Sequence, residues 1–177
     1  MTMTAETPTS IPTRPAAPPR LHIGLMILSG LILLGALSDF PAIFFDYGHT
    51  DRLVIFAQRL TSLKLALAPV IAGAALYFAI RHKLPHAIVA LATLMLVNWL
   101  TELPSIAIHG MEMKDGGSTL LVIAAQRFLY PLLAIAAMAL ALRNERLMTA
   151  TALTAIPMIV QWLGVAIFAV GVSIYGF

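Results

Sequence analysis

Two carboxylates and two cations stand at corresponding positions in an otherwise apolar chain. Asp39 and Glu102 each end a long apolar run, directly after a hydroxyl residue and two positions before a proline. Lys64 and Arg127 lie inside the apolar runs that follow. An unpaired charge in lipid costs several kcal/mol, so such side chains pair or face the protein interior. We therefore predict two ion pairs, Asp39–Lys64 and Glu102–Arg127.

Further polar side chains are expected beside these pairs. Asn98 lies four residues before Glu102, which places it one helical turn away on the same face. Arg59, five residues before Lys64, is expected at the outer interface, and Gln126 adds an amide. Together these side chains predict an outward-facing polar cavity that binds or passes a small polar or ionic solute.

A purely structural interpretation of the same charges stays open. Long basic side chains near a membrane boundary often bury their stems and extend the charge to water. Paired charges also lock helices together without binding anything. The protein would then be an accessory or scaffold subunit of a larger membrane complex.

A membrane-embedded enzyme is a further alternative, because carboxylates beside cations can transfer protons. The sequence contains no nucleophile–base pair, so we predict no catalytic residues and no cofactor. The absence of cysteine excludes disulfides and thiolate ligands. We predict no metal, although His49 and His109 with Asp46 and Glu112 leave an outer metal site as an alternative.

The composition is that of a helical membrane protein. The 177 residues are 60% hydrophobic and 11% charged, with a mean hydropathy of +0.91, whereas soluble domains carry about 25% charged residues. Several apolar runs are long enough to cross a hydrocarbon core of about 30 Å. The expected partners are the lipid bilayer and either further copies of the chain or a larger membrane complex, and no nucleic acid.

The fold that we expect is an all-α integral membrane protein with five transmembrane helices. Residues 1–20, rich in Thr, Pro and Ala, predict a disordered cytoplasmic tail, and residues 21–177 predict one transmembrane domain. The alternative for the first helix is a signal peptide cleaved near Ala36-Leu37-Ser38. The helices are predicted at about 21–37, 53–80, 86–103, 119–142 and 148–175, with a loop from Asp39 to about Arg52 between the first two.

The first four helices are predicted to form two tandem hairpins, helices 1–2 and 3–4, which repeat one another. The repeat units cover about 21–83 and 84–146, and the fifth helix, about 148–175, has no counterpart. Two units of equal orientation predict a pseudo-two-fold axis along the membrane normal. The matched pairs are Asp39/Glu102, Pro41/Pro104 and Lys64/Arg127, which are 63 positions apart, and Pro69/Pro131 and Arg81/Arg143, which are 62 apart.

The basic residues predict the orientation. With five spans, most cations near the helix ends fall on one side, which the positive-inside rule assigns to the cytoplasm. The amino terminus is then cytoplasmic, in a multi-pass protein of the inner (plasma) membrane. The cations on that side are Arg14, Arg20, Arg81, Lys83, Arg143 and Arg146.

Small residues four positions apart predict the faces on which helices pack closely. The pairs at this spacing are Ala68/Ala72, Ala75/Ala79, Ala137/Ala141 and Ala169/Ser173.

Overall fold

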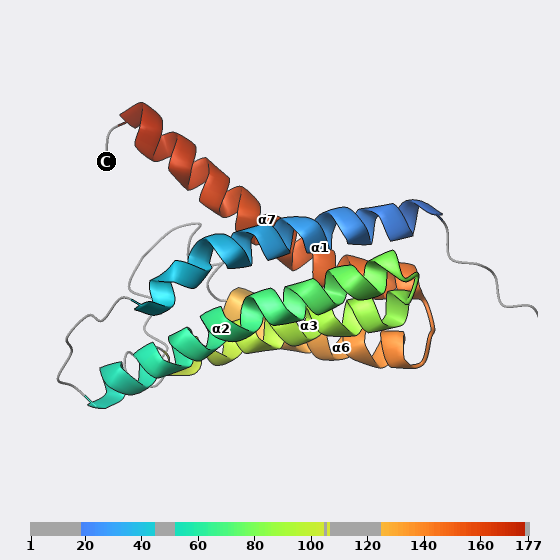
Figure 1. Cartoon of the computed structure of the whole chain (residues 1–177), viewed down its shortest axis with the longest axis horizontal. Helices are drawn as coiled ribbons and strands as arrows, with labels where there is room; N and C mark the ends of the chain where they lie inside the picture. The colour runs from blue at the N-terminus through green and yellow to red at the C-terminus, as the bar shows by residue number, and fades with distance from the viewer. Residues whose placement is uncertain (1–18, 45–51, 105, 107–124, 176–177) are drawn as a thin grey trace, which may run out of the picture.

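The computed structural model describes residues 19–44, 52–104, 106 and 125–175. Within these residues the chain forms five α-helices, two short helical turns and no strand (Figure 1). The α-helices are α1 (Pro19–Asp39), α2 (Arg52–Ile80), α3 (Leu84–Leu100), α6 (Tyr130–Leu142) and α7 (Leu147–Tyr175). The short turns are the 3-10 helix η1 (Phe40–Phe44) and the π-helix η2 (Ala125–Leu129).

These helices match the five predicted from the apolar runs. The ends of α1, α2, α3 and α7 lie within three residues of the predicted ones, and the predicted start of the fourth helix, about 119–124, lies outside the described residues. Residues 40–44 were expected in a loop and instead continue α1 as the 3-10 turn η1. The expected tail before residue 19 and the alternative metal site at His49 and His109 lie outside the described residues.

Each helix packs along the next one in chain order, and α7 also reaches α3 and α1. The start of α1, the α2–α3 turn and the α6–α7 turn gather at one end of the bundle (Figure 1). We call this the basic end, after Arg20, Arg81, Lys83, Arg143 and Arg146. Asp39 and Glu102, where α1 and α3 finish, therefore lie toward the opposite end.

Alanine stripes let the helices approach closely, as the small-residue spacing predicted. Helix α2 buries one alanine on each successive turn, and α6 does the same. Large side chains of α3, including the fully buried Ile88 and Leu91, fill the space between them. The buried alanines are Ala68, Ala72, Ala75 and Ala79 on α2 and Ala134, Ala137 and Ala141 on α6.

Helices α2 and α6 end in the same way at the basic end. In each, a residue with left-handed backbone follows the helix, His82 with φ 57° and Asn144 with φ 55°. The next N–H then donates to a carbonyl five residues earlier, which satisfies an orphaned acceptor of the last turn. The closing bonds run from Lys83 to Phe78 (2.9 Å) and from Glu145 to Leu140 (3.0 Å).

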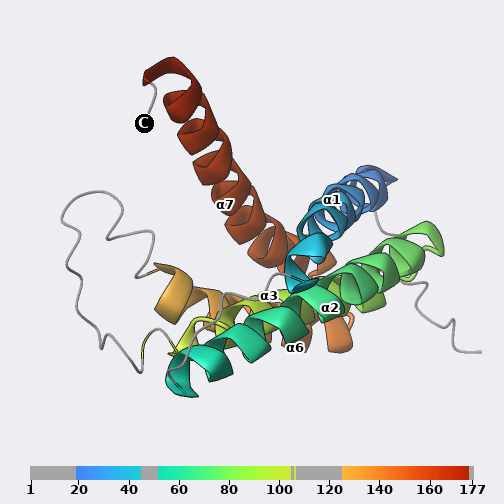
Figure 2. The same cartoon turned by 60° about the vertical axis from the view of Figure 1, so that its left-hand side comes forward.

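Three segments of the described chain are long and apolar enough to cross a membrane: Arg20–Phe44, Arg52–Ile80 and Leu147–Gly164. Helix α3 and the segment Arg127–Leu142 are apolar and shorter. The first half of α7 packs in the bundle, whereas its second half leaves the other helices (Figures 1 and 2).

Candidate functional site

Two adjoining cavities lie at the end of the bundle opposite the basic end. The large cavity, about 380 Å³, is bordered by α1, α2, α3 and α7. Its polar lining consists of Ser38, Asp39, Lys64 and Asn98. Its apolar lining includes Ile32, Leu94, Met158 and Trp162.

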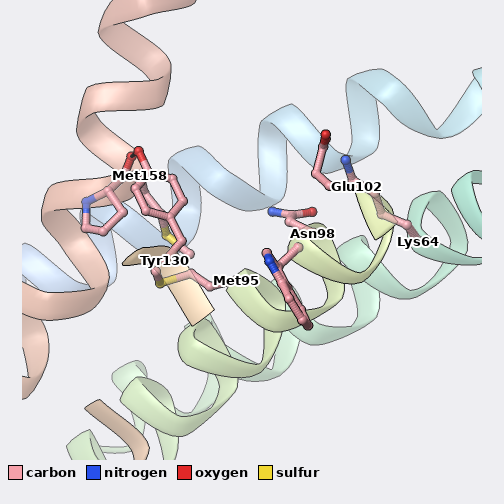
Figure 3. A pocket seen from close by; sticks show the side chains of 8 residues that line it. Lys64, Met95, Asn98, Glu102, Tyr130 and Met158 are labelled. Atoms are coloured by element: carbon pink, nitrogen blue, oxygen red, sulfur yellow. Dashed lines mark hydrogen bonds between the residues drawn. The ribbon is translucent and has the colours of Figure 1, made fainter. Parts of the chain in front are cut away.

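The small cavity, about 70 Å³, lies between α2, α3, α6 and α7 (Figure 3). Its lining combines the polar side chains of Lys64, Asn98, Glu102 and Tyr130 with Met95, Trp99, Pro157 and Met158. Three residues, Lys64, Asn98 and Met158, line both cavities. The two cavities therefore form one polar region with an acidic residue on each side.

Lys64 faces this region because of its place on α2. It lies one turn before Ala68, so it continues the buried alanine stripe toward the open end of the bundle. The side chain is half-buried. Figure 3 shows the Lys64 ammonium and the Glu102 carboxylate pointing toward one another, with Asn98 beside them. Asn98 and Glu102 thus share one face, as their spacing predicted.

Both acidic residues occupy the junction between a long helix and a short tight turn. Helix α1 ends at Asp39, and Pro41 lies in the 3-10 turn that follows. After α3, the Glu102 N–H donates to the Trp99 carbonyl at 2.9 Å, and helical turns resume at Leu103, just before Pro104. Proline is well tolerated at the start of a helical turn, where its missing N–H costs little. Both carboxylates are exposed.

The structure groups the charges differently from the two predicted ion pairs. Among the described residues, no ion pair joins Asp39 to Lys64 or Glu102 to Arg127. Lys64 shares the large cavity with Asp39 and the small cavity with Glu102, and in the described part of the chain it forms an ion pair with neither. Arg127 lines neither cavity, and its Nε is buried without a hydrogen-bond partner.

The backbone of Arg127 has a structural role that the sequence prediction missed. In an α-helix its carbonyl would accept from the N–H of residue 131, but Pro131 has none. The Trp99 indole N–H takes that place and donates to the Arg127 carbonyl at 2.8 Å. The proline ring also crowds this carbonyl, which accounts for the wider π turn η2 just before it. Trp99 therefore joins α3 to the start of α6.

A close contact joins α7 to α1 over the large cavity. A Cβ added at Gly35 would lie 2.7 Å from Cζ2 of Trp162, too close for any side chain. The glycine therefore lets the Trp162 ring lie against α1. At the 63-position shift of the proposed repeat, Gly35 corresponds to Asn98 and Ala36 to Trp99. Helix α1 therefore lacks both the amide and the indole that α3 carries at these positions.

The remaining predicted site residues lie at the margin. Arg59 is exposed and lines neither cavity. Gln126 lies in η2, and its side chain is outside the described part of the structure. Tyr130, Met158 and the two tryptophans were not predicted to line the site. The one sequence signal for the hydrogen bond of Trp99 is Pro131. Because proline has no N–H, the Arg127 carbonyl four residues earlier needs a donor from another helix.

In the described ranges, no three His, Cys, Asp or Glu residues gather as metal ligands would. No protein-family model, curated protein or solved structure matches the chain. The case for a function therefore depends on the geometry of the two cavities.

Proposed function

We propose that the protein spans a membrane five times, with its amino terminus in the cytoplasm. Three helices have the required length and apolar character. Large apolar side chains such as Leu34, Val70 and Leu132 are more than 60% exposed, as expected of residues that face lipid. Helix α3, with 17 residues, is about 26 Å long, close to the thickness of a hydrocarbon core. The basic end is then cytoplasmic.

We also propose that the first four helices are two tandem hairpins of common origin. The matched ends of α2 and α6 support this, because their left-handed residues, His82 and Asn144, are 62 positions apart, as are Arg81 and Arg143. The acidic junctions after α1 and α3 support it too. Helix α7 has no counterpart and closes one side of the cavities.

In this arrangement the protein binds or passes a small polar or ionic solute through an outward-facing site. The observation that carries this proposal is the shared lining of the cavities: one half-buried cation, Lys64, and one amide, Asn98, between two carboxylates. Polar groups that converge in a concave, partly apolar cavity are typical of ligand sites. Toward the basic end the core is closed, because Ala72, Ala75 and Leu91 are fully buried. This conformation is therefore one that binds from outside.

A thermal-stability screen of the purified protein against small polar solutes tests this function. A solute present at about 100 times its Kd should stabilise the folded state by about 2.7 kcal/mol. Lys64→Met removes the one cation of the shared lining, so it should weaken that stabilisation for an anionic solute, strengthen it for a cationic one, and leave the unliganded melting temperature nearly unchanged. Lys83→Met, at the exposed basic end, is the control that should keep it. If no solute stabilises the protein and Lys64→Met alone lowers the melting temperature, Lys64 has a structural role.

The second candidate function is that of an accessory subunit of a larger membrane complex. It is favoured by the second half of α7, which leaves the bundle and exposes Leu163, Val170 and Ile174 (Figure 2). Purification as a lone, stable species would count against an obligate subunit.

A further inference from the structure

The charges that line the two cavities do not balance. Asp39 and Glu102 contribute two negative charges, and Lys64 contributes the one positive charge among the described lining residues. Arg59 and Arg127, the other cations nearby in the sequence, line neither cavity. Lys64 also lines the large cavity but forms no ion pair with Asp39 in the described part of the chain, so the carboxylate of Asp39 has no described cation within ion-pair distance.

An anionic ligand at Lys64 would have to approach both carboxylates, since Lys64 shares one cavity with Asp39 and the other with Glu102.

The rest of the large cavity suits an apolar body. Ile32 and Leu94 line it together with the Met158 thioether and the Trp162 indole. Aromatic faces attract organic cations, and more strongly where water is excluded. At about 30 Å³ per water-sized group, a volume of about 380 Å³ has room for about 13 such groups, enough for a small organic molecule.

We propose that the large cavity binds a small organic cation, with its ammonium group at Asp39 and its apolar part against Trp162 and Met158. This inference rests on the proposed function and names the ligand class of the same site. Lys64 points toward Glu102 (Figure 3) and forms no ion pair with Asp39 among the described residues, which leaves the Asp39 carboxylate for the ligand. Asn98, between the two acidic residues, is placed to accept a hydrogen bond from the ammonium through its amide oxygen.

Intrinsic fluorescence can test this without a label, because the two tryptophans of the chain, Trp99 and Trp162, line the small and the large cavity respectively. The protein is placed in phosphatidylglycerol nanodiscs, whose lipids carry no ammonium group. Three probes of similar size are titrated: 2-phenylethylamine, the neutral 2-phenylethanol and the anionic phenylacetate. We expect a saturable response to the amine and a Kd for the alcohol at least about tenfold higher.

Substitutions at Asp39 test whether its carboxylate causes the preference for the amine over the alcohol. Asp39→Asn should raise the Kd of the amine to that of the alcohol, and Asp39→Glu should restore most of the preference. Glu145→Gln, an exposed carboxylate at the basic end, should change nothing. Repeating the titration in phosphatidylethanolamine nanodiscs identifies the source of the ammonium: a lost response means that the lipid headgroup occupies the same place, and an unchanged response means a soluble amine.

Two results would overturn the inference in distinguishable ways. Tighter binding of phenylacetate, abolished by Lys64→Met, would show that the cavity takes anions, and the proposed function would survive. Amine binding that is unaffected by Asp39→Asn would also refute the assignment. Failure of all three probes and of the wider solute screen would remove the proposed function as well.

Discussion

The hydrogen bond from Trp99 to the Arg127 carbonyl gives the most quantitative prediction. Trp99→Phe removes the indole N–H that donates at 2.8 Å and leaves an aromatic ring in its place. Pro131 cannot supply another donor, so the half-buried carbonyl loses its partner. A buried acceptor left unsatisfied costs about 1–3 kcal/mol. We expect the free energy of unfolding to fall by that amount.

A double-mutant cycle separates the free energy of this hydrogen bond from the effect of replacing the indole with the smaller phenyl ring. Pro131→Ala restores an N–H at residue 131, four residues after Arg127, so the carbonyl regains its α-helical donor. Trp99→Phe should then cost less than in the wild-type background, with a coupling energy of about 1–2 kcal/mol. Trp162→Phe is the control for ring contraction, because in the described part of the chain its indole makes no hydrogen bond.

The measurement is reversible unfolding in mixed detergent micelles, followed by helical circular dichroism so that no tryptophan is needed as a probe. All four corners of the cycle are compared at one detergent composition. Equal costs of Trp99→Phe in the wild-type and Pro131→Ala backgrounds would refute the reasoning. The indole would then stabilise the protein by packing alone, and the link between α3 and α6 would need another explanation.

Two further predictions concern backbone positions. Gly30→Ala meets nothing within 4 Å and should stabilise α1 by about 0.5–1 kcal/mol, whereas Gly35→Ala meets Trp162 at 2.7 Å and should be less stable than Gly30→Ala by about 1–3 kcal/mol. Equal stabilities in thermal unfolding would mean that Trp162 does not lie against α1. Asn144 has left-handed backbone, with φ 55°, so Asn144→Ala should lower the free energy of unfolding by about 1 kcal/mol and Asn144→Gly should leave it unchanged. Thermal unfolding measures both, and an equal loss of stability in the two variants would contradict the left-handed backbone.

The helices themselves were predictable because each is an apolar run bounded by charges, proline or glycine. The described helix ends lie close to the predicted ones, and the alanine spacing on α2 and α6 correctly identified buried faces. These features depend on local sequence. The loop expected at residues 40–44 was wrong, since Pro41 is compatible with a 3-10 turn that continues α1.

The grouping of the charges was not predictable from depth alone. Rise per residue gives the level of a side chain in the bundle and says nothing about the direction it faces. Lys64 lies five residues before Pro69, whereas Arg127 lies four residues before Pro131. One residue is a rotation of about 100° around a helix, and the π turn η2 alters the register further. Arg127 therefore does not face the site that Lys64 faces.

The contact between Gly35 and Trp162 could not be predicted either. It depends on how the first half of α7 lies against α1, and no spacing within either helix encodes that angle. The common face of Asn98 and Glu102 was easier to predict, because their spacing of four residues along the chain fixes it without reference to any other helix.

We propose that the two cavities, at the end of the bundle opposite the basic end, open to the outside of the cell. The chain contains no cysteine, so single cysteines can be introduced without removing any. Labelling of intact cells with a membrane-impermeant maleimide is the most direct measurement. Asn98→Cys, in both cavities, should be labelled from outside, and Ala75→Cys, fully buried toward the basic end, should not. An Asn98→Cys that reacts only after the cells are opened, or an Ala75→Cys that reacts equally well, would contradict the account.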